Sequence, residues 1–223
     1  YATIATLCTN FKYALSRADF MDMPMLKTVS PIDGSIYVER PLTCERDITL
    51  ALLNARTAQS LWQEYSLEKR AAICEKAIQY FEQNSEKIAL EICHQMGRPL
   101  AYCDGEIKGL AERARHMINI APAALADITP SAQEGSRRFI RRQPLGIVFT
   151  IAPWNYPLLT TVNSVIPALM AGNSVILKSS AQTPLCGEHF IEAFKQAGLP
   201  AHVLQGLYLN HSDAASIVAS GQV

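Results

Sequence analysis

Apolar and polar positions divide the chain into a helical first part and an alternating second part. Between residues 43 and 125, apolar side chains recur at helical spacing, as Leu67, Ala71 and Ile78 do, which predicts four helices. After Gly146, apolar runs of strand length alternate with helical stretches. The predicted strands cover 147–152, 174–178 and 203–208, and the predicted helices cover 157–171, 184–197 and 212–219. This order is typical of right-handed βαβ units, so we expect an α/β fold with a parallel sheet and helices on both faces.

Residues that commonly start or stop helices mark the ends of these elements. Thr43 and Ser66 are the expected N-caps of the first two helices. Thr183, followed by a proline, is expected to cap the helix after the second strand. The third helix, over 85–96, is expected to stop at "MGRP", and the fourth covers roughly 103–121.

Two stretches outside the helices predict extended structure. "SPIDGSIYVERP" carries "DG" at 33–34 between short extended runs, which predicts a β-turn or a hairpin. "SRRFIRRQPLG" predicts an exposed strand with solvated arginines, and a nucleic-acid patch is the alternative. The arginines concerned are Arg137, Arg138, Arg141 and Arg142. The net charge of zero, from 20 Lys and Arg against 20 Asp and Glu, favours the exposed strand and predicts no nucleic-acid partner.

Composition excludes some classes of protein without changing the fold prediction. The hydrophobic fraction of 49% and the charged fraction of 18% are ordinary for a globular protein. No stretch approaches the ~18 apolar residues of a membrane span, and the first residues do not resemble a secretory signal. The six cysteines lack C-x-x-C spacing, and the histidines lack ligand spacing, so no metal site is predicted. Scattered free thiols favour a reducing compartment, which predicts a cytoplasmic or a mitochondrial protein.

Three polar segments follow the three predicted strands, at the edge where open parallel sheets bind ligands. They are "PWN", "KSSAQT" and "LNHSD". Asn155 and Lys178 lie 23 residues apart, one strand–helix–strand step, so both can face the same crevice. The glycine-rich G-x-G-x-x-G turn of simple dinucleotide folds is absent after the first strand.

The second strand ends in a lysine where many dinucleotide folds place a carboxylate for the ribose. Lys178 is followed by Ser179, Ser180 and Ala181. A cation and hydroxyls can hydrogen-bond a ribose, and they tolerate a 2′-phosphate better than a carboxylate would. A surface lysine at a strand end is the alternative interpretation.

Asn155 and Cys186 each allow a chemical and a structural interpretation. Asn155 is a fixed amide donor between Pro153 and Pro157, as an oxyanion site requires, or it is the N-cap of the next helix. Cys186 lies in the first turn of a predicted helix, where a thiol pKa can fall, but a small structural residue is the favoured interpretation.

The stretches "QPLGIVFTIAPWNYPL", "IPALMAGNSVILKSSAQTP" and "FKQAGLP" resemble the N-terminal part of an aldehyde dehydrogenase. They follow the family patterns P-x-G-x-x-x-x-I-x-P-W-N-x-P, P-A-L-x-x-G-N-x-x-x-x-K and A-G-x-P. The match is close over 143–206 and looser over about 30–125. "ILKSSAQTPLCG" is most similar to the succinate-semialdehyde dehydrogenase branch. The resemblance implies a Rossmann-like cofactor domain that binds NAD or NADP.

The resemblance also implies roles for individual residues. Asn155 would donate its amide to the oxyanion of the acyl intermediates, and Lys178 would hydrogen-bond the adenosine ribose. The other expected cofactor-binding residues flank these two: Ile151, Ala152, Pro153, Trp154, Ser179, Ser180 and Ala181. Family members that prefer NAD often carry Glu where this chain has Ala181. The family as a whole commonly has Pro where this chain has Ser179.

The resemblance divides the chain into four regions. We expect an N-terminal extension with strands over 1–42, the helical part of the cofactor domain over 43–130, an oligomerisation strand segment over 131–145, and the Rossmann-like βαβ part over 146–223. The expected partners are an aldehyde substrate, for which succinic semialdehyde is one candidate, and further copies of the chain in a homo-oligomer.

The family's nucleophile and general base have no counterpart among these residues. Its nucleophilic cysteine and its general-base glutamate would follow Val223, together with most of the catalytic domain. We therefore expect a portion of an aldehyde-oxidising enzyme that is inactive alone. The alternative is a non-catalytic nucleotide-binding or oligomerisation module derived from that family.

Overall fold

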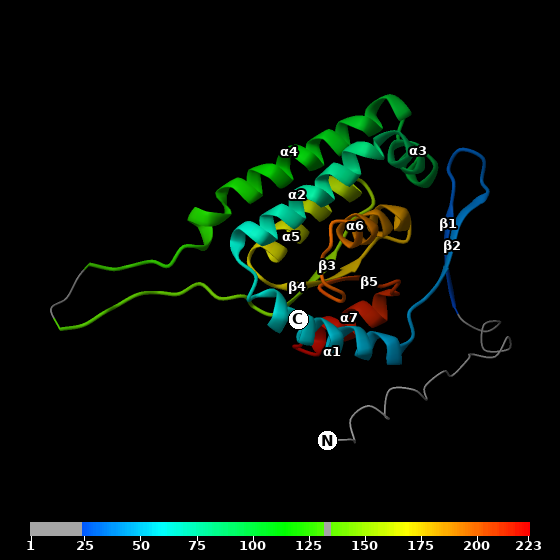
Figure 1. Cartoon of the computed structure of the whole chain (residues 1–223). Helices are drawn as coiled ribbons and strands as arrows, with labels where there is room; N and C mark the ends of the chain where they lie inside the picture. Colours follow the sequence, from blue (N-terminus) through cyan, green and yellow to red (C-terminus); the bar gives the residue numbers. More distant parts are fainter. Residues whose placement is uncertain (1–23, 132–134) are drawn as a thin grey trace, which may run out of the picture.

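The computed structural model describes residues 24–131 and 135–223. These residues form a two-stranded hairpin, a helical region and a βαβ region, which Figure 1 shows in chain order. The elements are β1 (Met25–Val29), β2 (Ile36–Pro41), α1 (Glu45–Trp62), α2 (Leu67–Gln83), α3 (Ser85–Met96), α4 (Leu100–Leu125), β3 (Ile147–Ile151), α5 (Pro157–Met170), β4 (Ser174–Lys178), α6 (Pro184–Gln196), β5 (Leu204–Gly206) and α7 (His211–Ala219). Residues 1–23 of the predicted N-terminal extension lie outside the described residues.

The three-stranded sheet has the order β3-β4-β5 and is parallel throughout. Ile147 pairs with Ser174 and Ile151 with Lys178, so β3 and β4 end level with each other. The predicted parallel strands are confirmed, and β4 has its predicted bounds. The third strand is shorter than predicted, since only Leu204–Gly206 pairs with β4.

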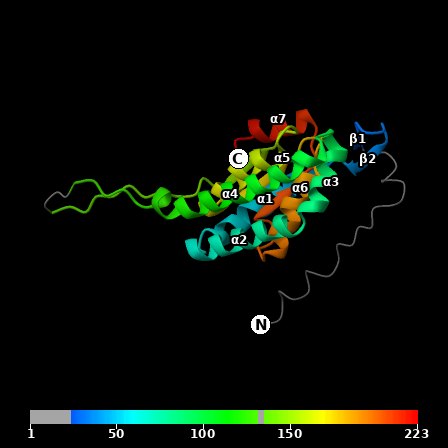
Figure 2. The same cartoon turned by 90° about the horizontal axis from the view of Figure 1, so that it is seen from above.

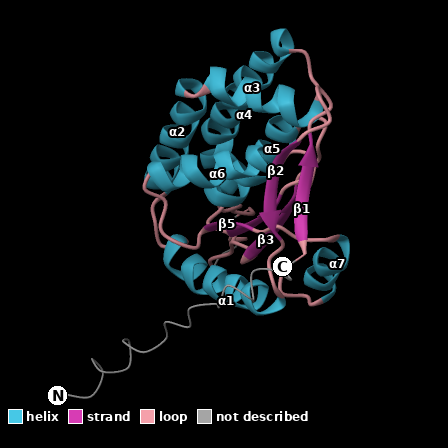
Figure 3. Cartoon of the chain, turned by 90° about the vertical axis from the view of Figure 1, so that its right-hand side faces the viewer, coloured by secondary structure: helices cyan, strands magenta, loops and turns pink. Residues whose placement is uncertain are grey.

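Helices cover both faces of this sheet, as predicted. Figures 1 and 3 show α1 and α7 on one side, with α2, α4, α5 and α6 on the other. On the first side, Ile48 and Leu52 of α1 pack with Ile176 of β4 and Ile217 of α7. On the second side, a larger core joins the helices to Val175 and Leu177 of β4. The carboxyl ends of the strands are therefore held between two packed layers.

The predicted hairpin is present as β1 and β2, which pair antiparallel. Asp33 closes its turn, because Oδ1 accepts hydrogen bonds from the Ser35 amide and hydroxyl at 3.0 and 2.8 Å. Gly34 has a φ of +76°, a conformation that glycine adopts without strain. Arg40 of β2 pairs with Glu188 of α6 at 3.0 Å, which ties the hairpin to the main body.

The predicted helix caps are partly wrong. Ser66 caps α2 by accepting a hydrogen bond from the Lys69 amide, and Gly97 ends α3 in the left-handed conformation, as predicted. Cys44, rather than Thr43, stands at the N-cap of α1, because the Thr43 hydroxyl accepts from the Tyr208 amide instead. Thr183 occupies the N-cap of α6, yet its side chain makes no capping bond.

The strand predicted within 131–145 is not present in the described part of that segment. Residues 126–131 and 135–146, which we call the arm, project from the body as two extended lengths of chain (Figures 1 and 2). An isolated bridge between Ile128 and Ile140 joins them. An extended segment becomes a strand only when a neighbouring segment pairs with its backbone. The arm belongs to neither sheet of the described residues, so apart from that bridge it has no such neighbour there. The oligomerisation role of this segment stays a prediction.

The four arginines of the arm are exposed, as the solvated interpretation expects. Arg137 and Arg141 lie over the ring of Phe139 at 5.5 and 5.0 Å, and Arg141 approaches Asp127 at 3.6 Å. Arg138 donates to the carbonyl of Ser131. Within residues 24–131 and 135–223, no helix combines the length and the apolarity that a membrane crossing requires.

Candidate functional site at the carboxyl edge of the parallel sheet

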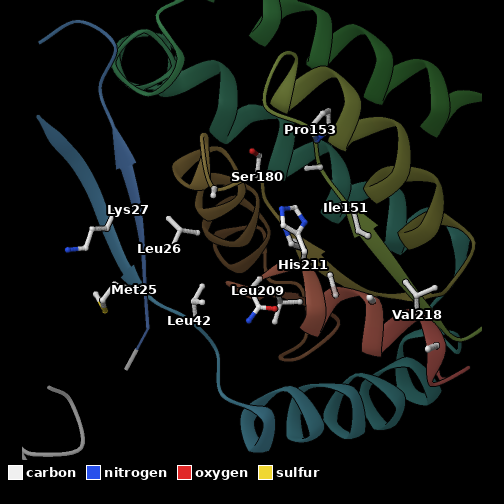
Figure 4. Close-up of a pocket in the computed structure, with 17 residues that line it drawn as sticks. Met25, Leu26, Lys27, Leu42, Ile151, Pro153, Ser180, Leu209, His211 and Val218 are labelled. Atoms are coloured by element: carbon white, nitrogen blue, oxygen red, sulfur yellow. The ribbon is translucent and has the colours of Figure 1, made fainter. Parts of the chain in front are cut away.

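A pocket of about 880 Å³ lies where β3, β4 and β5 end. Figure 4 shows that residues of β1, of the strand ends and of α7 surround it. The lining residues are Met25, Leu26, Lys27, Leu42, Ile151, Ala152, Pro153, Lys178, Ser180, Ala181, Leu209, Asn210, His211, Ala214, Ala215, Val218 and Ala219. The edge of the sheet that the sequence indicated is therefore hollow and accessible.

Most of the residues predicted from the sequence come together in this pocket. Ile151, Ala152 and Pro153 line it from the end of β3, and Lys178, Ser180 and Ala181 line it from the end of β4. Three predicted residues lie outside its lining: Trp154, Asn155 and Ser179.

Ser179 lines a neighbouring cavity of about 200 Å³ against α6, and not the main pocket. Alternation along the extended chain turns Ser179 away from Lys178 and Ser180. Trp154 is 55% exposed beyond the end of β3 and is absent from the lining.

Lys178 gives the pocket its electrostatic character. The residue is only 7% exposed, and burial lowers the pKa of its ammonium group. Its Nζ donates to the Ser179 carbonyl at 3.5 Å, and no carboxylate in the described part of the chain pairs with it. Lys27 also lines the pocket but pairs with Glu39 at 2.9 Å.

The described lining contains neither Asp nor Glu, so the charge of Lys178 is not neutralised there. A buried cation without a counter-ion is unfavourable unless a ligand or solvent supplies acceptors. The pocket therefore suits a ligand with hydroxyl or anionic oxygens next to apolar surface.

The hairpin holds the loop that follows β4. Thr28 of β1 is 1% exposed, and its hydroxyl donates to the Ala181 carbonyl at 2.7 Å. The Ser180 hydroxyl accepts from the Gln182 amide at 3.2 Å. Thr28 contributes to the site from 153 residues away, and no local sequence signal distinguishes it from other strand threonines.

The third predicted segment, "LNHSD", reaches the same pocket through the start of α7. Asn210 caps this helix, since its Oδ1 accepts from the Asp213 amide at 2.8 Å and from the Ser212 hydroxyl at 2.7 Å. Asn210 and His211 line the pocket, and Figure 4 shows the His211 ring beside it. All three strand-end segments thus contribute to one site.

Asn155 lies next to this pocket without lining it. It does not cap α5, because Tyr156 occupies the N-cap position. The Asn155 Oδ1 instead accepts a hydrogen bond from the amide of the next residue, Tyr156, at 3.1 Å. The helix-cap interpretation of Asn155 is therefore wrong. Its Nδ2 has no hydrogen-bond partner among the described residues, so this donor is available to a ligand.

Glu106 of α4 caps α5 in place of Asn155. Its Oε1 accepts from the amides of Leu158 and Leu159 at 2.8 and 3.3 Å, and its Oε2 pairs with Arg98. The sequence pattern did not single out Glu106 or Arg98. The sequence signal that could have indicated Glu106 is its carboxylate on the apolar face of a predicted helix, where a charged side chain needs a partner.

Burial raises the thiol pKa of three cysteines, Cys74, Cys103 and Cys186. Cys186 is 3% exposed, and burial raises its pKa well above the ordinary value, which supports the structural interpretation of this residue. Burial also raises the pKa of Cys74 to about 12. In residues 24–131 and 135–223, no group of three or more His, Cys, Asp or Glu side chains could hold a metal ion.

The fold and the pocket define an α/β protein with a ligand site at the carboxyl edge of a parallel sheet. A sequence model described as "Aldehyde dehydrogenase family" matches residues 21–221, so the chain belongs to that family. It is 30% identical over 183 residues to an alpha-ketoglutaric semialdehyde dehydrogenase of Bacillus subtilis strain 168, covering 81% of this chain and 37% of the relative. The resemblance found in the motifs is confirmed at the level of the family.

Two further proteins show the range of the similarity. A probable NADP⁺ succinate-semialdehyde dehydrogenase of Sinorhizobium fredii strain NGR234 is 29% identical over 185 residues, covering 83% of this chain and 38% of the relative. The structure of an NADP-dependent glyceraldehyde-3-phosphate dehydrogenase from Bacillus halodurans C-125, complexed with NADP, matches with a TM-score of 0.83 at 26% identity. That match covers 90% of this chain and 43% of the other. The chain spans less than half the length of these relatives.

Proposed function

We propose that this chain forms the dinucleotide-binding part of an NAD(P)-dependent aldehyde dehydrogenase. The observation that carries the proposal is the buried Lys178, without a carboxylate partner in the described residues, at a pocket of about 880 Å³. Its ammonium group can donate to ribose hydroxyls or phosphate oxygens. Apolar residues such as Leu26 and Val218 offer surface to the flat rings, and the volume lies in the range of small-molecule sites.

We propose that the pocket accepts NADP at least as well as NAD. A carboxylate beside the ribose would repel a 2′-phosphate, whereas Lys178 attracts it and Ala181 leaves room for it. The S. fredii relative is described as an NADP⁺ enzyme, and the B. halodurans structure contains NADP, which supports this assignment. The bound dinucleotide would supply the hydride acceptor, and the residues of this chain would bind and orient it.

In the whole enzyme, we propose that Asn155 donates its free Nδ2 to the oxyanion of the reacting carbonyl. The nucleophilic cysteine and the general-base glutamate of the family mechanism match no residue of this chain, so we propose that the chain alone does not oxidise aldehydes. Succinic semialdehyde is a candidate substrate, because relatives include a probable succinate-semialdehyde dehydrogenase.

Dinucleotide titration of the purified chain tests the proposal. We expect NADP⁺ and NAD⁺ to bind, and Lys178→Met to weaken NADP⁺ binding by about tenfold, as the loss of one charge-assisted hydrogen bond should. Lys195→Met is the matched control, because the Lys195 side chain is 77% exposed at the far end of α6. Absence of dinucleotide binding, or equal affinities for the two variants, would refute the cofactor assignment.

A non-catalytic module derived from the family is the second candidate. The enzyme would use the Asn155 Nδ2, which has no partner among the described residues, as an oxyanion donor, whereas the module would leave this exposed group solvated. Aldehyde-dependent NADPH formation by the protein encoded by the complete reading frame would exclude the module. Dinucleotide binding without such activity, for succinic semialdehyde and for uncharged aldehydes, would favour it.

A further inference from the structure

The carboxylate of Glu106 is buried at the start of α5, and the proposed function assigns it no role. Its side chain is 1% exposed. Burial raises the pKa of this carboxyl group, while the amides of Leu158 and Leu159 and the guanidinium of Arg98 act in the opposite direction. A buried carboxylate is unfavourable unless hydrogen bonds and an opposite charge compensate it, and here both are present.

Arg98 connects this carboxylate to the turn that contains Asn155. It follows Gly97 at the junction of α3 and α4, and its side chain is 12% exposed. One guanidinium nitrogen pairs with Glu106 Oε2, and the other donates to the backbone carbonyl of Asn155. The guanidinium also lies over the Tyr156 ring, 4.5 Å from its centroid. A single planar group therefore contacts both Asn155 and Tyr156.

The network holds the turn on both sides of the Asn155 side chain. On the N-terminal side of Tyr156, the Asn155 carbonyl accepts a hydrogen bond from Arg98. On the C-terminal side of Tyr156, the amides of Leu158 and Leu159 donate to Glu106. The Asn155 Oδ1 is bonded to the Tyr156 amide. The backbone and the amide oxygen of this residue are therefore constrained, while its Nδ2 donor stays unpaired in the described residues.

We propose that Glu106, acting through Arg98, is a positioning residue that holds the Asn155 donor in its reactive orientation. The inference rests on the proposed function, because it assigns the network to the oxyanion donor. A helix cap alone requires only the two bonds from the α5 amides to Oε1. The contacts of Arg98 with Asn155 and Tyr156 lie outside that cap and are explained by positioning.

Arg98 variants separate positioning from capping. Arg98→Met removes the link to Asn155 and leaves both amide bonds of Glu106 in place. Arg98→Lys keeps a charge near Glu106 but cannot contact both partners with one planar fork. The matched control is Arg115→Met, which removes another arginine paired with two carboxylates, Glu75 and Glu82, on the opposite part of α4.

The experiment follows the Asn155 side-chain amide and the Tyr156 backbone amide by proton–nitrogen correlation spectroscopy and hydrogen exchange. Both Arg98 variants are expected to shift the Asn155 signals and to speed Tyr156 exchange by about tenfold, as local loosening does. NADP⁺ affinity should change less than twofold, because the lining of the pocket is untouched. In the whole enzyme, kcat should fall about tenfold or more at unchanged KM for the dinucleotide.

The proposal is overturned if both Arg98 variants match Arg115→Met in Asn155 signals and Tyr156 exchange. It is also overturned if the turn loosens while kcat is retained. Where Arg98→Met unfolds, the result for Arg98→Lys decides. The amide measurements need no dinucleotide, so failure of the NADP⁺ titration would count against the proposed function and leave the positioning result readable.

Discussion

Gly187 is the residue that lets the first turn of α6 approach the loop after β4. A β-carbon built on it would lie 1.8 Å from the Ser179 hydroxyl oxygen and 3.1 Å from the Ser179 β-carbon. Its backbone conformation is helical and open to any residue, so the requirement for glycine here is steric. The missing β-carbon leaves room for the Ser179 side chain, which lines the small cavity beside α6 while its neighbours line the main pocket.

Gly187→Ala is expected to destabilise the protein by about 1–3 kcal/mol, as overpacking of a well-packed contact does. Adding Ser179→Ala should recover part of this loss, because it removes the closest atom and leaves the 3.1 Å contact. The two substitutions should therefore couple in a double-mutant cycle of urea unfolding.

Gly105→Ala is the control for this residue-scale prediction. Gly105 lies within α4 and has no atom within 4 Å of the added β-carbon, so the substitution should raise stability by up to about 1 kcal/mol. If Gly187→Ala behaves like Gly105→Ala, the contact with Ser179 does not constrain the loop.

At the scale of elements, the two helices behind the site start in the same unusual way. Both α5 and α6 begin with a proline, and neither has a capping bond from its own N-cap residue. Their first free amides are bonded to side chains of the helical layer, Glu106 for α5 and Gln95 for α6. The Gln95 carbonyl also accepts from Gln182, so α3 contacts the loop after β4.

These contacts show which parts of the structure the sequence could predict. The β3–α5–β4–α6 order follows from apolar runs and from local turn residues, so its bounds were predicted nearly to the residue. The caps of α5 and α6 were not predictable from the local sequence. Glu106 lies 52 residues from the Leu158 amide that it caps, and Gln95 lies 90 residues from the Leu185 amide. Thr183 was the expected local cap, but its hydroxyl is buried without a partner among the described residues.

Gln95→Met should destabilise the protein by about 1–3 kcal/mol, since it leaves the Leu185 amide without an acceptor in a part-buried position. Thr183→Val removes a hydroxyl that has no partner and should be neutral or slightly stabilising. Urea midpoints at constant m-value measure both changes. A larger loss for Thr183→Val than for Gln95→Met would restore the local cap and refute the assignment to α3.

At the scale of the whole molecule, the described body is two packed layers around a small sheet, and the arm is the part that leaves it (Figure 1). Four large apolar side chains on the arm are exposed: Ile128, Phe139, Ile140 and Leu145. Leu145 is 93% exposed, and an apolar side chain this exposed contributes no burial energy to a monomer. The extended backbone and the apolar side chains together suit pairing with another copy of the chain.

We predict that the protein self-associates through the arm, and that Phe139→Ser with Ile140→Ser lowers its mass in solution toward that of a monomer. Light scattering coupled to size-exclusion chromatography measures the change. The free energy of unfolding of the monomer should change by less than about 0.5 kcal/mol, because both side chains are about half exposed already. Leu90→Ser is the control, since Leu90 is 48% exposed on α3, on the side of the body opposite the arm (Figure 1).

A wild-type protein that is monomeric across the concentration range contradicts the prediction. So does an oligomer that persists in the double variant, or one lost equally in Leu90→Ser. If the protein binds nucleic acid and neutralising Arg137 and Arg138 abolishes this binding, the arginines of the arm form a nucleic-acid patch instead.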